Sequence, residues 1–203
     1  NTWAKYRDIM QDVVDRTLER ELASGTFKLG GEGKVVEVDE CKLHMAKYHR
    51  GHIPATDKIW LVGIIERDRD ENGARKSAFM LTTNRPQSVL GPFIKKWVAE
   101  RSILISDGWK GYGPELKDFV LHERVIHDYE FAHTTVVDGK EVNVNTNHIE
   151  REWVEIRKIM KHLSPEFYEA QIRKEIFRLL YLAGQKEKER PYIFMEKMAQ
   201  LTK

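Results

Sequence analysis

A chain of 203 residues, with 41% hydrophobic and 33% charged side chains, is long enough to bury the core of one domain with a helical appendage. Its single cysteine, Cys41, excludes internal disulfides and multi-cysteine zinc sites, and no apolar run approaches the ~20 residues that span a bilayer. The formal net charge of +2 is the sum of an acidic part up to Glu150 and a basic part after it. This division fits a protein that binds metal in one place and a polyanion in another, and a solvated helix surface explains it equally well.

The first elements are an N-terminal helix and three strands. Residues 1–28 are predicted to form a helix that leads into the core, because its apolar residues share one helical face: Met10, Val13, Val14, Leu18 and Leu22. Strands are predicted at about 34–43, 58–67 and 76–83. The Asn72-Gly73 pair predicts a hairpin between the last two strands.

Helices and strands then alternate. We expect an amphipathic helix at 87–100, a strand covered on both faces at 103–106, a short helix near 114–120, a strand near 124–131 and a hairpin at 134–144. A helix from Asn147 to Leu163 follows, and its apolar residues recur at helical spacing on one face: Ile149, Trp153, Ile156, Met160 and Leu163. Ser164 and Pro165 are a helix start signal, so 164–203 is predicted to be a helical extension of a 29–163 domain. The β-β-β-α-β-α-β-α order predicts an α/β fold with a mixed sheet.

Two carboxylates stand at the ends of apolar runs, where folding would hold them at the edge of the core. Asp39 follows the strand segment 35–38, and Asp107 ends an apolar strand just before Gly108, where ligand sites tend to lie in α/β sheets. Asp39 also fits a half-exposed strand, and Asp107 also fits a turn or helix cap. Converging carboxylates repel one another, and a divalent cation relieves that repulsion. Together with Glu150 they predict metal-assisted phosphoryl transfer.

Asn147 and Glu150 share one face of the first turn of the last predicted domain helix. Their spacing fits a capping box, in which Asn147 caps the helix and Glu150 reaches back to it. A carboxylate at this position is also favoured by the helix dipole, so capping and metal binding remain compatible roles.

Three histidines, His44, His49 and His52, share a segment with Lys47 and Arg50. Zinc ligation would need a second ligand pair with a recognisable spacing, which the sequence lacks. A solvated basic loop is therefore favoured, and DNA backbone contact by Lys47 and Arg50 is its functional form.

Aromatic and basic residues elsewhere also fit nucleic-acid binding. Trp109 and Lys110 follow Asp107 and could stack on or clamp a nucleic acid, although Trp109 fits the core equally well. The helices after Arg151 carry basic residues off their apolar stripe, and these predict DNA backbone contacts: Arg157, Lys158, Lys161, Arg173, Lys174 and Arg178.

Five segments, taken in order, resemble the transposase domain of the Merlin superfamily and its bacterial insertion-sequence relatives. They are 30–40, 60–66, 106–112, His127 with Phe131, and 145–153. The resemblance covers about 30–163. The family often has Ser at the position of Cys41 and a different small residue at that of Gly108, and neither difference removes a carboxylate.

The resemblance implies an RNase H-like fold and a DDE active site in which Asp39, Asp107 and Glu150 bind two Mg²⁺ or Mn²⁺ ions. Asn147 is a second catalytic candidate, because some bacterial relatives rely on an Asn near this position. The implied partners are double-stranded DNA, as transposon ends and target, and a second copy of the chain. We expect a DNA-end-binding region upstream, and a nuclear location, or the nucleoid in a bacterium. One alternative is an RNase H-like nuclease without strand transfer, and another is a domesticated DNA-binding module that has lost catalysis. The presence of all three carboxylates argues against the second alternative.

Overall fold

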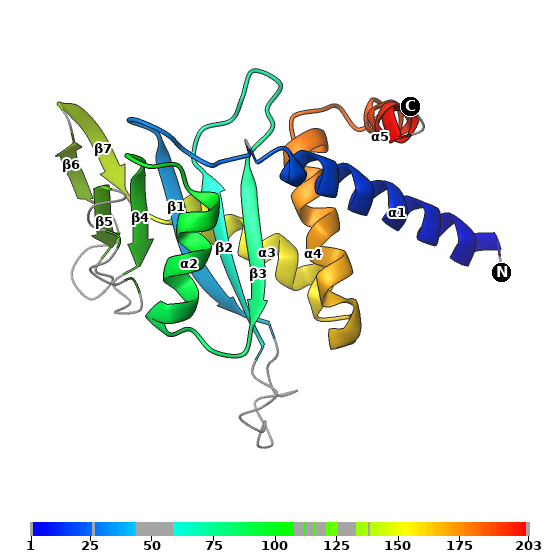
Figure 1. The fold of residues 1–203 in the computed structure, drawn as a ribbon, viewed down its shortest axis with the longest axis horizontal. Coiled ribbons are helices and arrows are strands. Elements are labelled where there is room, and N and C mark those ends of the chain that lie inside the picture. Colours follow the sequence, from blue (N-terminus) through cyan, green and yellow to red (C-terminus); the bar gives the residue numbers. More distant parts are fainter. Residues whose placement is uncertain are drawn as a thin grey trace. The chain divides into compact units, whose positions relative to one another are not determined.

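The computed structural model describes residues 2–25, 27–43, 59–107, 112, 116, 121–125, 133–137 and 139–201. The chain forms two compact units. The first is an α/β unit made of Lys28–Asp68 and Ser77–Leu163, and the second is a helical unit made of Asn1–Phe27, Arg69–Lys76 and Ser164–Lys203. Figure 1 labels their elements.

A five-stranded mixed sheet forms the centre of the α/β unit (Figure 1). Its strands are β1 (Val35–Lys42), β2 (Trp60–Glu66), β3 (Ser77–Thr82), β4 (Ile103–Asp107) and β5 (Leu121–Val125). Their order is β3-β2-β1-β4-β5, with β1, β2 and β3 antiparallel and with β4 and β5 parallel to β1. This is the RNase H-like arrangement that the resemblance implied.

Helices cover both faces of this sheet (Figure 1). Helix α2 (Gln87–Trp97) lies in front of β1, and helix α3 (Asn147–Met160) lies behind the sheet and contacts β1 and β2. Four members of the apolar face predicted for this helix are buried, namely Ile149, Trp153, Ile156 and Met160. The fifth, Leu163, lies beyond the end of α3 and is half-buried.

A separate hairpin of β6 (His133–Val137) and β7 (Lys140–Val144) confirms the predicted second hairpin. Gly139 adopts a φ of 78° at its turn. The hairpin's valines share a buried cluster with strands β1, β4 and β5, made of Val35, Ile103, Ile105, Val125, Val137, Val142 and Val144. This cluster packs the hairpin against the part of the sheet formed by β1, β4 and β5.

The helical unit consists of α1 (Thr2–Ala23), a 3-10 turn η4 (Pro165–Phe167), α4 (Tyr168–Phe177), a π-helical turn η5 (Arg178–Leu182) and α5 (Arg190–Leu201). Its core contains Val14, Leu18 and Phe177. The tip of the β2–β3 hairpin belongs to this unit, because Arg75 N donates to Leu179 O at 2.9 Å.

The structure corrects three predicted boundaries. Helix α2 ends at Trp97 rather than near residue 100, because Val98 forms a parallel bridge with Leu29. Strand β5 begins at Leu121 rather than near 124, because its pairing with β4 starts there. The helix predicted to begin at Ser164 and Pro165 starts with a 3-10 turn, becomes α-helical only at Tyr168 and continues as a π-helical turn from Arg178.

The short helix predicted at 114–120 lies outside the described residues except for Leu116. In the described part of the chain, no helix has both the length and the apolar character needed to cross a bilayer.

Candidate functional site

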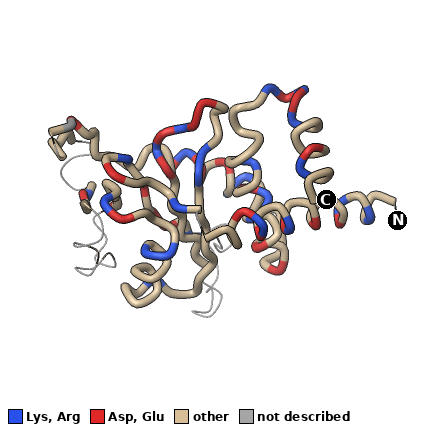
Figure 2. The backbone as a smooth tube through the Cα atoms, turned by 45° about the horizontal axis from the view of Figure 1, so that its top comes forward, with Lys and Arg blue, Asp and Glu red and all other residues tan. Residues whose placement is uncertain are grey.

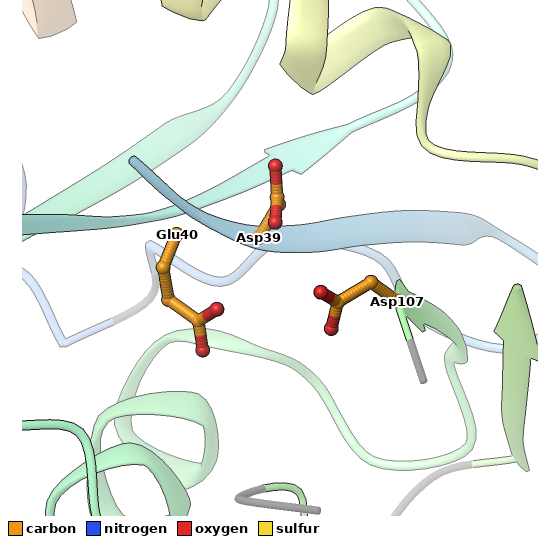
Figure 3. Close-up of side chains that lie close together, drawn as sticks. All are labelled: Asp39, Glu40 and Asp107. Carbon is orange, nitrogen blue, oxygen red and sulfur yellow. The ribbon is translucent and has the colours of Figure 1, made fainter. Parts of the chain in front are cut away.

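Three carboxylates meet where β1 and β4 run side by side. Val38 lies opposite Ser106 in the parallel register, so Asp39 and Asp107 come next on adjacent strands. One oxygen each from Asp39, Asp107 and Glu40 lies within 4.8 Å of the others. Figure 3 shows Asp39 and Glu40 leaving β1 on opposite sides and Asp107 directed from β4 towards them. Parallel pairing thus joins residues 68 positions apart in one acidic group.

The surroundings of the Asp39 carboxyl group disfavour its ionised form. Burial raises the pKa of Asp39 to about 6, and the nearby charges of Asp107 and Glu150 add to this shift. The Trp153 indole opposes it by donating a hydrogen bond to Asp39 Oδ2 at 2.7 Å. A positive charge placed among these carboxylates would therefore be strongly favoured.

Glu40 is the member of the group that the sequence analysis left out. Strand alternation puts its Cα on the face opposite to Asp39, but its longer side chain reaches the same group. The Tyr112 hydroxyl donates to Glu40 Oε1 at 2.8 Å, and Arg85 Nη1 lies 3.4 Å from Glu40 Oε2. Burial, with the charges of Asp107 and Asp39, raises the pKa of Glu40 to about 7.

Successive turns of helix α3 contact alternate residues of β1. Trp153 donates to Asp39, and four residues later Arg157 Nε donates to Cys41 Sγ at 2.9 Å. Two strand residues advance about 6.7 Å and four helical residues about 6 Å, so the two elements stay in step. Cys41 is fully buried, as expected for a small core residue, and burial raises the pKa of its thiol.

Gly63 on β2 makes room for this helix. It pairs with Asp39 across the sheet, and a Cβ atom there would lie 2.8 Å from Phe79 Cε1 and closer still to the Trp153 ring. The indole that bonds Asp39 therefore occupies the space left by a missing side chain. No sequence motif marked this glycine, because the close approach is tertiary.

The beginning of α3 corrects the predicted capping box. The helix starts at Asn147, and Thr146 is the N-cap residue, so Asn147 is not the cap. The first-turn amides of His148 and Ile149 instead donate to Glu37 Oε2, each at 3.0 Å. A buried carboxylate on β1, 111 positions away from His148, satisfies the donors that a local cap would otherwise serve.

Glu150 and Asn147 are both exposed at this helix end. The Thr146 hydroxyl donates to Glu150 Oε1 at 2.7 Å. Glu150 is near enough to raise the pKa of Asp39, but it is not part of the group formed by Asp39, Glu40 and Asp107. Two of the three predicted carboxylates thus lie together, and the third stands beside them on α3.

The donor set fits a hard divalent cation. All three members of the group offer carboxylate oxygens, which are the ligands preferred by Mg²⁺, Mn²⁺ and Ca²⁺. Their mutual repulsion and partial burial give a cation a clear electrostatic reason to bind.

Basic and acidic residues are interspersed along the backbone (Figure 2), and the helices that were predicted to contact DNA carry both kinds. Lys158 and Lys161 are exposed, and Lys158 also pairs with the exposed Glu155 at 2.7 Å. Arg173 and Arg178 are less available than predicted, because Arg173 pairs with Asp15 and Arg178 with Glu175. Four predicted DNA-binding residues lie outside the described residues, namely Lys47, Arg50, Trp109 and Lys110.

Comparison with known proteins agrees with this arrangement. The sequence has no match among curated proteins. A family model described as the ISXO2-like transposase domain matches residues 28–178, which include the sheet, α3 and the carboxylates of Asp39, Glu40, Asp107 and Glu150. The chain therefore belongs to the ISXO2-like transposase domain family.

Proposed function

We propose that this chain is the catalytic domain of a cut-and-paste DNA transposase, which cleaves DNA strands and transfers them to a target with two Mg²⁺ or Mn²⁺ ions. The acidic group formed by Asp39, Glu40 and Asp107 carries this proposal. Membership of a DDE-type transposase family adds that the chain acts on DNA and uses a divalent metal.

In this proposal, Asp39 and Asp107 bind the metal with Glu150, and Glu40 supports them. Divalent ions held by these carboxylates would supply the positive charge that activates an attacking water or 3′-hydroxyl and stabilises the leaving oxygen. The chain supplies positioning: β1 and β4 fix the aspartates, and the Trp153 N–H orients the Asp39 carboxylate. Asn147, exposed one turn before Glu150, would contact the DNA or a catalytic water.

Three finer features belong to the same proposal. The ordered motifs support a place in the Merlin superfamily. The chemistry of joining two transposon ends supports a homodimer that binds double-stranded DNA. Such an enzyme works where the genome is, in the nucleus or, in a bacterium, in the nucleoid.

The direct test incubates the full-length protein with transposon-end DNA, target DNA and Mg²⁺, and sequences the products. The wild type should cleave the ends and join them to the target. Asp107→Asn should abolish both steps with little effect on folding or DNA binding, because it removes a metal ligand at almost constant volume. Glu100→Gln, which neutralises an exposed carboxylate of the same unit, is the control and should retain activity.

The alternatives give different products. Cleavage without joining would identify an RNase H-like nuclease. DNA binding without any cleavage would identify a domesticated binding module. Full activity in Asp107→Asn would move the catalytic site elsewhere in the chain.

A further inference from the structure

We propose that Glu37 is a positioning residue: together with Arg67, it fixes the first turn of α3 against β1 and so sets the location of Glu150 relative to Asp39. The inference rests on the proposed metal-dependent function, and it assigns a role to a carboxylate that would not touch the metal or the DNA.

Glu37 is fully buried, and both of its oxygens are used. Oε2 accepts the backbone amides of His148 and Ile149, and Oε1 accepts the His148 side chain at 2.7 Å. A carboxylate at a helix N-terminus also interacts favourably with the helix dipole. The bonds leave the first turn of α3 no freedom to slide along β1 without exposing unpaired polar groups in the interior.

Arg67 balances the buried charge and extends the clamp. Its Nε donates to Glu37 Oε1 at 2.8 Å, while Nη1 and Nη2 donate to the carbonyls of Asn143 and Asn145 at 2.6 and 2.8 Å. One guanidinium thus joins β1 to the segment that leads from β7 into α3. Its planar, fixed donor geometry suits this role better than a flexible lysine would.

The clamp lies close to two proposed metal ligands along the chain. Glu37 stands two residues before Asp39 on the same face of β1, and Ile149, whose amide it accepts, directly precedes Glu150. Farther along, Trp153 bonds Asp39 itself. The distance between Asp39 and Glu150 is therefore set at both ends by contacts between α3 and β1, and Glu37 makes the contact nearest to Glu150.

The test uses the full-length protein and two readouts that need no DNA cleavage. Amide hydrogen exchange of His148 and Ile149 reports on the clamp directly, and Mn²⁺ affinity, measured from the EPR signal of free Mn²⁺, reports on the site. The variants are Glu37→Gln, Glu150→Gln and their combination, with Asp107→Asn as the reference for loss of a ligand.

Glu66→Gln is a matched control. Glu66 is also a buried carboxylate on the central sheet that accepts a backbone amide, Gly30 N at 3.0 Å, and a cation, Lys34 Nζ at 3.1 Å. It has no bond to α3 among the described hydrogen bonds. A general effect of removing a buried charge would therefore appear in both variants, whereas a positioning effect would appear only in Glu37→Gln.

We expect Glu37→Gln to accelerate exchange at His148 and Ile149, because the new amide nitrogen donates where an acceptor is needed. Mn²⁺ affinity should fall about tenfold or more, the range typical of residues that orient metal ligands. Because Glu37 acts through Glu150, adding Glu37→Gln to Glu150→Gln should weaken Mn²⁺ binding little further. Glu66→Gln should leave both readouts near the wild type.

The inference is overturned if Glu37→Gln binds Mn²⁺ as tightly as the wild type, if its effect multiplies with that of Glu150→Gln, or if Glu66→Gln loses as much affinity. If Glu37→Gln does not fold, His148→Ala removes one of the four bonds to Glu37 and should give a smaller change in the same direction. If Asp107→Asn binds Mn²⁺ as tightly as the wild type does, the proposed metal site is refuted instead. In that case unchanged exchange at His148 and Ile149 in Glu37→Gln would also refute the clamp.

Discussion

At the scale of single residues, Asp39 shows how the site resists its own charge. Its carboxylate is largely buried, lies beside Asp107 and within range of Glu150, and has one strong donor in Trp153. Burial outweighs that donor, and the pKa rises from 3.8 to about 6. The folded protein therefore keeps a proton on Asp39 at pH values where the unfolded chain has lost it.

Asp39→Asn should stabilise the metal-free protein near pH 7. A raised folded-state pKa means that stability from this residue is complete below about pH 3.8 and is lost as the pH rises through about 6. The Asn side chain does not titrate, so the variant should gain about 1–3 kcal/mol at neutral pH and nothing near pH 4. Thermal denaturation from pH 4 to 8 in a chelator measures this gap.

Asp68→Asn, which replaces an exposed aspartate of the same unit, should melt like the wild type throughout this range. If Asp39→Asn and the wild type differ in stability by the same amount at every pH, the charge of Asp39 is not the source of the difference.

At the scale of elements, the docking of α3 on the sheet decides the geometry of the site. The helix contributes an apolar face that any amphipathic helix could offer. Its exact location depends on polar contacts to alternate residues of β1, Glu37, Asp39 and Cys41, and on the space above Gly63. A change at Gly63 should therefore act through the helix rather than through the strand.

Gly63→Ala should destabilise the α/β unit by about 1–3 kcal/mol, the usual cost of overpacking. The added methyl group would meet the Trp153 and Phe79 rings. The smaller ring of Trp153→Phe should relieve part of this clash, so the cost of Gly63→Ala should be lower in that background. Chemical denaturation of the four proteins measures the coupling, and an equal cost in both backgrounds would mean that the clash is relieved elsewhere.

At the scale of the whole molecule, some basic residues form ion pairs within the protein, and others lie exposed on its surface. Arg173 contributes to the helical unit through Asp15, whereas Lys158 and Lys161 are exposed on and just after α3. An exposed ion pair such as Lys158 with Glu155 contributes little to stability, so Lys158 can readily exchange Glu155 for a DNA phosphate as its partner.

Replacing Lys158 and Lys161 with Ala should weaken DNA binding to a similar degree for all sequences. Each lost phosphate contact should lower the slope of log K against log salt by about 0.9, because fewer counterions are released. Arg173→Ala removes one positive charge from a residue that is already paired with Asp15, so it should leave the slope unchanged. An unchanged slope in the lysine variant would make this face a solvated surface and leave DNA contact to other residues.

The sequence by itself determined the elements whose signals are local. Alternating and continuous apolar runs located β1 to β4, the Asn72-Gly73 pair located the hairpin of β2 and β3, and helical periodicity identified most of the buried face of α3. The position of Asp39 and Asp107 at the ends of apolar runs could be read in the same way, because it depends only on neighbouring residues. The boundaries of α2 and β5 could not, since they depend on pairing with Leu29 and β4.

Only the tertiary structure decided which polar groups meet. Glu40 joins the acidic group beside Tyr112, 72 positions away, and Glu37 takes over the helix end that a local capping box was expected to serve. Periodicity tells which face of an element is buried, but it does not tell what that face meets. A buried carboxylate must find its donors wherever the fold brings them, and in this protein the fold brings β1 and α3 together across more than 100 residues of chain.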